Sequence, residues 1–442
     1  MKNVLMIIPF FPPMAGGGVY RPLSFVKYLG RYGWSPSVLT MDSSSYWIGD
    51  ESLLAEVPAN CPVLRTKTMS GQAVLSRLRH RPAGSARGGG AQVRSSRRFG
   101  FLRKLGAAAL VPDTYIGWYP FAVREGLATL RAGSFDAIYS TSPPETSHLI
   151  GLRLSAVSGI PWIADFRDPW MNLHLLPTPT SLHRRAHRTL ERRVCARASA
   201  VVVTTPWHRD RLAAAYPGMA PVELIRNGYD PDDIESVADI APRGDSFQIV
   251  HAGMLTQKRS AVSFLRGLKL FLDRTPGARE RCRAIFLGPR ESENDEAASA
   301  LGLSDVASFR DTAPHAETLK IERSSHILVL IKHANPLYDG LVPGKLYEYI
   351  GVGRPILAVA PEGEAAAIVR RHRRGEVVAH DDPAKIAGAL AAMYAAYRAG
   401  TLDASYDLSP VADYRRDVLA GRLAERLDAL GGLRGPQEKV KA

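Results

Sequence analysis

The sequence predicts an α/β protein made of two doubly wound lobes, each a parallel sheet with helices on both faces. Three observations support this. The chain has 442 residues, more than one ordinary core organises. Short apolar runs alternate with segments of helical periodicity along nearly the whole chain. A stretch rich in Asp, Pro and Gly interrupts this alternation at residues 228–246, which indicates a domain boundary.

These features divide the chain into four segments. We expect a first lobe at residues 1–232, a linker at 233–246, a second lobe at 247–405, and a last helix with its tail at 406–442. The last helix, near 411–430, follows a turn that contains proline, and we expect it to pack back across the first lobe.

The first lobe opens with a continuous apolar run at 4–8, typical of a strand buried on both faces. A helical pattern after three glycines ends at Gly30 and Gly33, and a strand at 37–40 completes a βαβ unit. Further strands are expected at 136–140, 161–165, 200–204 and 222–225, with helices at 146–158 and 182–198. Thr205-Pro206 offers an N-cap followed by a helix-starting proline.

The second lobe repeats the alternation. Its expected strands are 248–252, 284–287, 307–309, 327–331, 356–359 and 377–379. Its expected helices are 262–272, 317–323, 345–352, 364–371 and 383–398. Ligands gather at the carboxyl ends of the strands in such sheets, so motifs directly after a strand carry most weight.

The charge balance indicates an acidic partner. A formal net charge of +14 and a pI near 9.8 suit nucleic acid, an anionic lipid surface or a phosphate-rich substrate. The segment from Arg77 to Lys104 has many arginines and no acid, and is expected to be a basic loop. Its only aromatic residues are Phe99 and Phe101, which disfavours nucleic-acid binding. We expect attraction to an anionic membrane surface, with a solvated insertion as the alternative.

Cysteine usage and hydropathy indicate a cytoplasmic protein. Cys61, Cys195 and Cys282 are far apart, which predicts neither a disulfide framework nor a zinc site. No apolar run is long enough to span a bilayer, and the N-terminal run is too short for a signal peptide. Membrane contact is therefore expected to be peripheral.

Two motifs follow strands of the first lobe. Gly16-Gly17-Gly18 allows backbone N–H groups to approach a phosphate, although a plain turn explains it equally well. Asp165, Arg167 and Asp168 follow a buried strand. Either aspartate is a candidate acceptor-binding residue or general base and Arg167 a phosphate ligand, with a structural ion-pair network as the alternative.

Two more motifs belong to the second lobe. Gly253 begins a turn that ends in Lys258 and Arg259, cations suited to a diphosphate, with a solvated basic turn as the alternative. Pro343-Gly344 opens a helix, Lys345 adds a charge, and Glu348 lies one turn further on. This carboxylate suits a ribose diol or a sugar hydroxyl, and the alternative is an ordinary first-turn acid.

In combination and order, these motifs resemble glycosyltransferase family 4, whose members have the GT-B fold of two Rossmann-like lobes facing across a cleft. The likeness includes Ser142-Pro143-Pro144 and the residues from Ile225 to Asp230. The family carries two glutamates with seven residues between them. Glu348 matches the second, whereas the first falls at Gly340, beside Asp339.

The resemblance implies a retaining transfer of a sugar from a nucleotide-diphosphate donor to a hydroxyl acceptor, with no cofactor and no essential metal. It implies donor binding by Gly17, Gly18, Gly253, Lys258, Arg259, Pro343, Gly344, Lys345 and Glu348. The base is expected near residues 287–290 and 314–315, and the acceptor to be a sugar or lipid-linked molecule in polysaccharide or glycolipid assembly. The alternatives are a sugar-nucleotide 2-epimerase and a basic protein that binds membranes or nucleic acid without catalysis.

Overall fold

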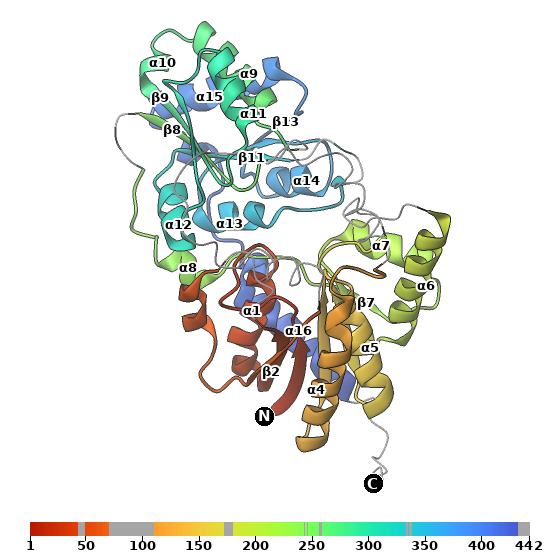
Figure 1. Cartoon of the computed structure of the whole chain (residues 1–442). Helices are drawn as coiled ribbons and strands as arrows, with labels where there is room; N and C mark the ends of the chain where they lie inside the picture. Colours follow the sequence, from red (N-terminus) through yellow and green to blue (C-terminus); the bar gives the residue numbers. More distant parts are fainter. Residues whose placement is uncertain are drawn as a thin grey trace, which may run out of the picture. The chain divides into compact units, whose positions relative to one another are not determined.

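A computed structural model describes residues 1–42, 49–69, 110–171, 180–242, 244, 246–255, 259–332, 335 and 338–431 (Figure 1). The chain divides into two compact units. The first runs to Arg226 and takes in the chain from Ala420 onward, and the second is Asn227–Leu419. The basic segment predicted at 77–104 lies outside the described residues, as does Lys258.

The second unit begins at Asn227, before the expected boundary at residue 232, and the backbone of Tyr229 is hydrogen-bonded within it. The N–H of Tyr229 donates to the Tyr414 carbonyl (2.9 Å), and its own carbonyl accepts from the N–H of Arg416 (2.9 Å). Helix α8 (Pro231–Glu235) then begins with Asp230 as its N-cap, so part of the expected linker is helical.

The sheet of the first unit is parallel throughout. Among the described residues its strand order is β3-β2-β1-β4-β5-β6-β7. The strands are β1 (Lys2–Ile7), β2 (Trp34–Met41), β3 (Val63–Thr66), β4 (Ala137–Ser142), β5 (Trp162–Phe166), β6 (Ala200–Val203) and β7 (Val222–Leu224). The helices are α1 (Tyr20–Tyr28), α4 (Tyr119–Ala132), α5 (Thr146–Ser158), α6 (Ser181–Arg197) and α7 (Pro206–Ala215). Strands β4 and β5 are buried along their whole length, as central strands covered on both faces must be.

Threonine side chains cap the starts of α6 and α7 in the first unit. Thr205 accepts from the N–H of His208 at 3.3 Å and Pro206 is the first helical residue, which confirms the predicted start of α7. The last helix, α16 (Arg416–Gly431), starts later than predicted. From Ala420 onward it belongs to the first unit, where Asp428 accepts hydrogen bonds from Trp34 (2.9 Å) and Lys2 (2.8 Å).

The second unit holds another parallel sheet, with order β10-β9-β8-β11-β12-β13 among the described residues. Its strands are β8 (Phe247–Ala252), β9 (Cys282–Leu287), β10 (Ala307–Arg310), β11 (Ile327–Ile331), β12 (Ile356–Val359) and β13 (Gly375–Val378). Its longer helices are α9 (Val262–Arg274), α11 (Ser292–Ala300), α12 (His315–Arg323), α13 (Gly344–Val352), α14 (Glu364–Arg371) and α15 (Pro383–Arg398). Strand β11 shows why its sequence is uniformly apolar: Ile327, Val329 and Ile331 enter one core cluster, and Leu328 and Leu330 enter the other.

No helix in the described part of the chain is long and apolar enough to cross a membrane.

Candidate active site

Asp165 lies near the carboxyl end of β5 and is completely buried. Its carboxylate accepts from Arg21 Nε (3.0 Å) and Nη2 (2.9 Å), from Tyr139 Oη (2.5 Å) and from Thr141 Oγ1 (3.2 Å). Burial alone would raise the pKa of Asp165, but the Arg21 guanidinium and the Tyr139 hydroxyl bring it below its usual value. Both carboxylate oxygens of Asp165 already accept hydrogen bonds from protein groups. This favours a structural ion pair, the alternative that the sequence left open, over a role as general base.

Arg167 holds the loops around it. Its Nε donates to the carbonyl of Ser142 (3.1 Å), Nη2 to that of Pro143 (2.7 Å), and Nη1 to that of Gly18. A Cβ at Gly18 would lie 2.8 Å from Nη1, so glycine is needed there for this contact, whereas one at Gly17 would meet nothing within 4 Å. Arg167 thus ties the glycine loop to the end of β4, and its predicted contact with a phosphate stays a prediction.

Of the two aspartates in this motif, Asp168 is the more accessible to a ligand. It is half-buried, and among the described residues it makes no hydrogen bond or ion pair. Burial raises the pKa of Asp168, and the negative charge of Asp165 adds to this against the opposing effect of Arg167. A partly exposed carboxyl group with a raised pKa is suited to accept a proton near neutral pH.

Glu145 is a second acidic group in this region, and the sequence analysis missed it. It precedes α5, 3% exposed, and burial together with the charge of Asp113 raises its pKa well above the usual value. The charge of Asp168 contributes in the same direction, so the two carboxyl groups lie within electrostatic reach of each other. The only sequence signal was its place directly after the strand and the Ser142-Pro143-Pro144 turn.

In the second unit, helix α13 begins at Gly344, with Pro343 as its N-cap. Gly344 is exposed, and a Cβ there would meet nothing within 4 Å. The first N–H groups of a helix have no intrahelical acceptor and carry the positive end of the helix dipole. The start of α13 can therefore receive an anion, as its sequence predicts.

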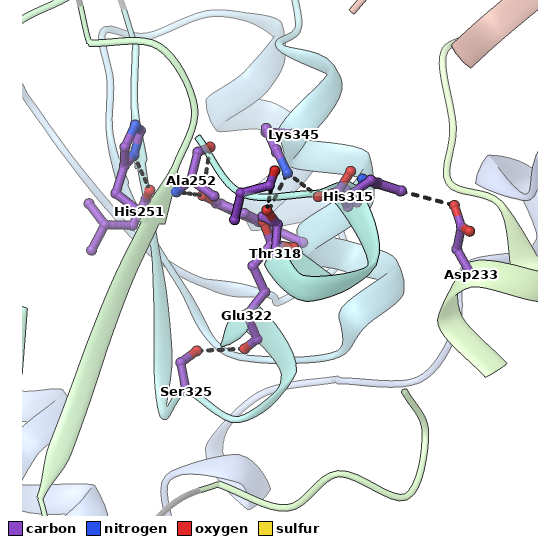
Figure 2. Close-up of polar contacts among 12 residues, drawn as sticks. Asp233, His251, Ala252, His315, Thr318, Glu322, Ser325 and Lys345 are labelled. Atoms are coloured by element: carbon purple, nitrogen blue, oxygen red, sulfur yellow. Dashed lines mark hydrogen bonds and ion pairs between the residues drawn. The ribbon is translucent and has the colours of Figure 1, made fainter. Parts of the chain in front are cut away.

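The ammonium group of Lys345 lies between two glutamates (Figure 2). It is 3.0 Å from Glu322 Oε1 and forms a second ion pair with Glu348 Oε1. Burial by itself would raise the pKa of Glu348, but Lys345 and then His315 lower it to about 2. Burial and the charge of Glu348 raise the pKa of Glu322 well above its usual value. The charge of Lys345 is therefore already matched by ionised Glu348, which leaves less of it for a diphosphate than the sequence suggested.

His315 adds a second cation beside Glu348. Its Nε2 is 3.1 Å from Asp233 Oδ2 in α8 (Figure 2). Burial would lower the pKa of His315, but Asp233 and Glu348 raise it above the usual value. Glu348, with a side chain 16% exposed, is thus a carboxylate paired with Lys345 whose lowered pKa also reflects the charge of His315. Glu322 and Asp233 were missed by the sequence analysis because they reach this cluster from other helices.

Two glycine turns meet at the carboxyl ends of β8 and β9. The N–H of Gly253 donates to the Leu287 carbonyl at 2.8 Å, and a Cβ at Gly288 would lie 2.2 Å from the Gly253 carbonyl oxygen. Both glycines have positive φ, +144° and +153°, so neither position suits another residue. A pocket at this place is lined by Gly253, Leu255, Leu287, Gly288, Arg290 and Phe309, among others. Part of the predicted base-binding stretch thus lines a pocket.

Near these turns lie two cations that face no acid at ion-pair distance among the described residues. Arg259 is half-buried, and burial lowers its pKa. Lys332, directly after β11, is 4% exposed, and its Nζ donates to the Asp339 carbonyl oxygen at 3.0 Å. Lys332 was missed, although a lysine that follows a buried strand is itself a signal. Asp339 has a buried Oδ1 without a partner in the described part of the chain.

Comparisons with known proteins find a matching domain in the first unit and a shared fold over the whole chain. Residues 16–228 match the model of the glycosyl transferase 4-like domain, whereas no curated protein matches the chain.

Among solved structures, the sucrose-phosphate synthase from Thermosynechococcus elongatus is 14% identical to this chain, with a TM-score of 0.64. The match covers 98% of this chain and 100% of the synthase chain. Anabaena HepE in complex with UDP has 14% identity, a TM-score of 0.63 and coverages of 97% and 100%. The trehalose-6-phosphate synthase OtsA has 12% identity, a TM-score of 0.65 and coverages of 97% and 99%. The chain therefore has the GT-B fold of these structures, and its residues 16–228 match the glycosyl transferase 4-like domain.

Proposed function

We propose that this protein is a glycosyltransferase that moves a sugar, with retention at the anomeric carbon, from a nucleotide-diphosphate donor to a hydroxyl acceptor. The observation that carries the donor assignment is the carboxylate of Glu348, which is ion-paired with Lys345 in the first turns of α13, next to exposed Gly344. An ionised carboxylate accepts hydrogen bonds from a vicinal diol, and the helix N-terminus receives phosphate.

The remaining parts of the donor have matching surroundings in the same unit. We place the base beside the pocket at Gly253 and Gly288, where Phe286 and Phe309 stack on each other in the lining. The HepE neighbours were solved with UDP and with UDP-glucose, which makes uridine donors the first to test. In this proposal, protein cations and helix N–H groups stabilise the charge on the leaving diphosphate, so that no metal is needed.

For the acceptor, we assign Asp168 in the first unit. It is a partly exposed carboxyl group in its motif, and its raised pKa suits proton transfer from a hydroxyl. Asp165 and Arg167 support it by fixing the surrounding loops. In the second unit, Asp339 is the candidate to replace the first family glutamate, since one of its buried oxygens has no partner in the described part of the chain.

The acceptor class rests on charge alone. The basic segment from Arg77 to Lys104 would draw the protein to anionic lipid on the cytoplasmic face of a membrane. A lipid-linked acceptor in polysaccharide or glycolipid assembly fits this attraction. Flotation with anionic vesicles tests it: deletion of 77–104 should abolish flotation while donor binding persists, and unchanged flotation would contradict it.

The donor assignment is tested by titration calorimetry of UDP- and GDP-sugars into the wild type and Glu348→Gln. We expect the variant to bind at least about tenfold more weakly, since it loses a charged acceptor. Glu280→Gln, at an exposed glutamate of the short helix Ala278–Arg281, is the matched control and should bind normally. Equal affinity of Glu348→Gln and wild type would remove the assignment.

A second assay separates the transferase from a sugar-nucleotide 2-epimerase. Free nucleoside diphosphate is measured with and without a lipid extract as the source of acceptor. A transferase releases it in proportion to acceptor, whereas an epimerase converts the donor sugar without dependence on acceptor.

A further inference from the structure

We propose that Lys332 is a phosphate-binding residue, which together with Arg259 forms a cationic pair for the donor diphosphate at the carboxyl ends of β11 and β8. This inference rests on the proposed function, since it specifies how the donor site meets the charge of its ligand. It adds a residue that belongs to none of the motifs recognised in the sequence.

Lys332 is buried without an acidic partner for its positive charge in the described part of the chain. Its side chain is 4% exposed, and its ammonium has one hydrogen bond, to the carbonyl oxygen of Asp339 at 3.0 Å. An ammonium group has three donors and loses its hydration on burial, so a buried lysine normally has an acidic partner. No carboxylate oxygen of the described residues lies within ion-pair distance of Lys332. A bound anion would supply the missing charge and acceptors.

Lys332 lies at the end of the sheet where ligands bind in parallel sheets. Strands β8 and β11 are neighbours, with Ile249 opposite Ile327 and Val250 opposite Leu328. One residue further on, His251 Nδ1 contacts the Val329 carbonyl at 2.8 Å (Figure 2). The chain then leaves β8 at Gly253 and β11 at Lys332, at the same edge of the sheet. This is the edge at which parallel sheets bind ligands.

Two positive charges act together at this edge of the sheet. The charge of Arg259 lowers the pKa of both Lys332 and His251, so its positive charge acts at the ends of both strands. Like charges brought together without an acid between them repel, and a dianionic phosphate group relieves that repulsion. Arg259 likewise has no ion pair among the described residues.

Lys345 is less suited than Lys332 to bind the phosphate, because it already has acidic partners. Its ammonium lies between Glu322 and Glu348, and the negative charge of Glu348 compensates it. A diphosphate needs cations that are not already neutralised. In the described part of the second unit, Lys332 and Arg259 meet that condition at the ligand edge of the sheet.

The pKa of Lys332 provides a measurable sign of phosphate binding at its ammonium group. Burial and the charge of Arg259 lower its pKa to about 8, against the opposing effects of Asp339 and Glu364. A phosphate bound at the ammonium stabilises the charged form and raises the pKa again. Binding at pH 8 should therefore take up a fraction of a proton from solution, and this uptake should vanish when Lys332 is replaced.

The experiment compares ligands that differ only in phosphate. Titration calorimetry at pH 8 measures uridine, UMP and UDP, or the corresponding series of whichever base the wild type binds best. Lys332→Met is expected to bind the diphosphate about tenfold more weakly, with nucleoside affinity unchanged, and Lys332→Arg to retain most of it. Lys269→Met, at a surface lysine paired with Asp273, is the control and should match the wild type. Repeating the titrations in two buffers of different ionisation enthalpy gives the proton uptake.

The outcomes separate the two proposals. If the wild type binds no nucleotide, the proposed function fails and this inference fails with it. If the wild type binds the diphosphate and Lys332→Met binds it equally well, the inference alone is overturned. Equal weakening of nucleoside and diphosphate would also overturn it, because that result indicates a structural role. Circular dichroism of each variant verifies folding.

Discussion

The buried pair of Asp165 and Arg21 makes a quantitative prediction. Asp165→Asn preserves the shape of the side chain but removes the negative charge that is paired with the guanidinium of Arg21, which is 6% exposed. Removing one partner of a buried ion pair costs roughly 3–5 kcal/mol. With a urea dependence of about 2 kcal/mol per M, the unfolding midpoint of the first unit should fall by roughly 1.5–2.5 M.

Tryptophan fluorescence measures this effect selectively. All six tryptophans lie at or before Trp207, and the sequence from Asn227 to Leu419 contains none. Urea unfolding followed by fluorescence thus reports on the first unit. Asp210→Asn, in an exposed pair with Arg209, is the control and should change stability by about 0–1 kcal/mol.

A double-mutant cycle identifies the cause. If the pair is structural, Arg21→Met should reduce the cost of Asp165→Asn, because the buried charge is then gone. The pH dependence has a defined sign. The folded pKa of Asp165 is lowered, so its contribution is present above the usual value of 3.8 and is lost as pH falls below it. Unchanged stability of Asp165→Asn combined with lost transfer activity would refute the structural role and restore Asp165 as the base.

Three further variants test other parts of the structure. Asp168→Asn should abolish sugar transfer yet leave nucleotide-sugar binding unchanged in calorimetry, and full activity would exclude it as the proton acceptor. Gly288→Ala, at φ +153° with its Cβ 2.2 Å from a carbonyl oxygen, should destabilise the second unit by about 1–3 kcal/mol in thermal unfolding, whereas Gly388→Ala, at an open helix position, should be neutral or stabilising. Thr205→Ala should cost about 1 kcal/mol in the fluorescence assay, since it removes the cap of α7, and no change would mean that the cap bond contributes nothing.

The alternation of strands and helices could be predicted because buried parallel strands have uniformly apolar sequences. Strand β11 is the clearest case, since it faces a core cluster on each side. The elements that escaped prediction lack this signal. Among the described residues, strand β3 (Val63–Thr66) pairs only with β2, and it is mostly half-buried or exposed. Helix α11 buries only Asn294 and Ala298, so it has almost no apolar stripe.

The residues of the candidate site were harder to predict than the fold. Lys345 and Lys332 together show the physical reason. A sequence displays formal charges, but the charge available to a ligand depends on what each group faces after folding. Lys345 stands in a recognisable motif, yet Glu322 reaches it from α12, 23 residues earlier, and Glu348 compensates it. Lys332 stands in no motif, yet the fold buries it next to Arg259 without an acid at ion-pair distance among the described residues. The motifs are therefore the basis for the proposed donor site, and the pattern of compensated and uncompensated charge is the basis for proposing Lys332 rather than Lys345 as the phosphate-binding lysine.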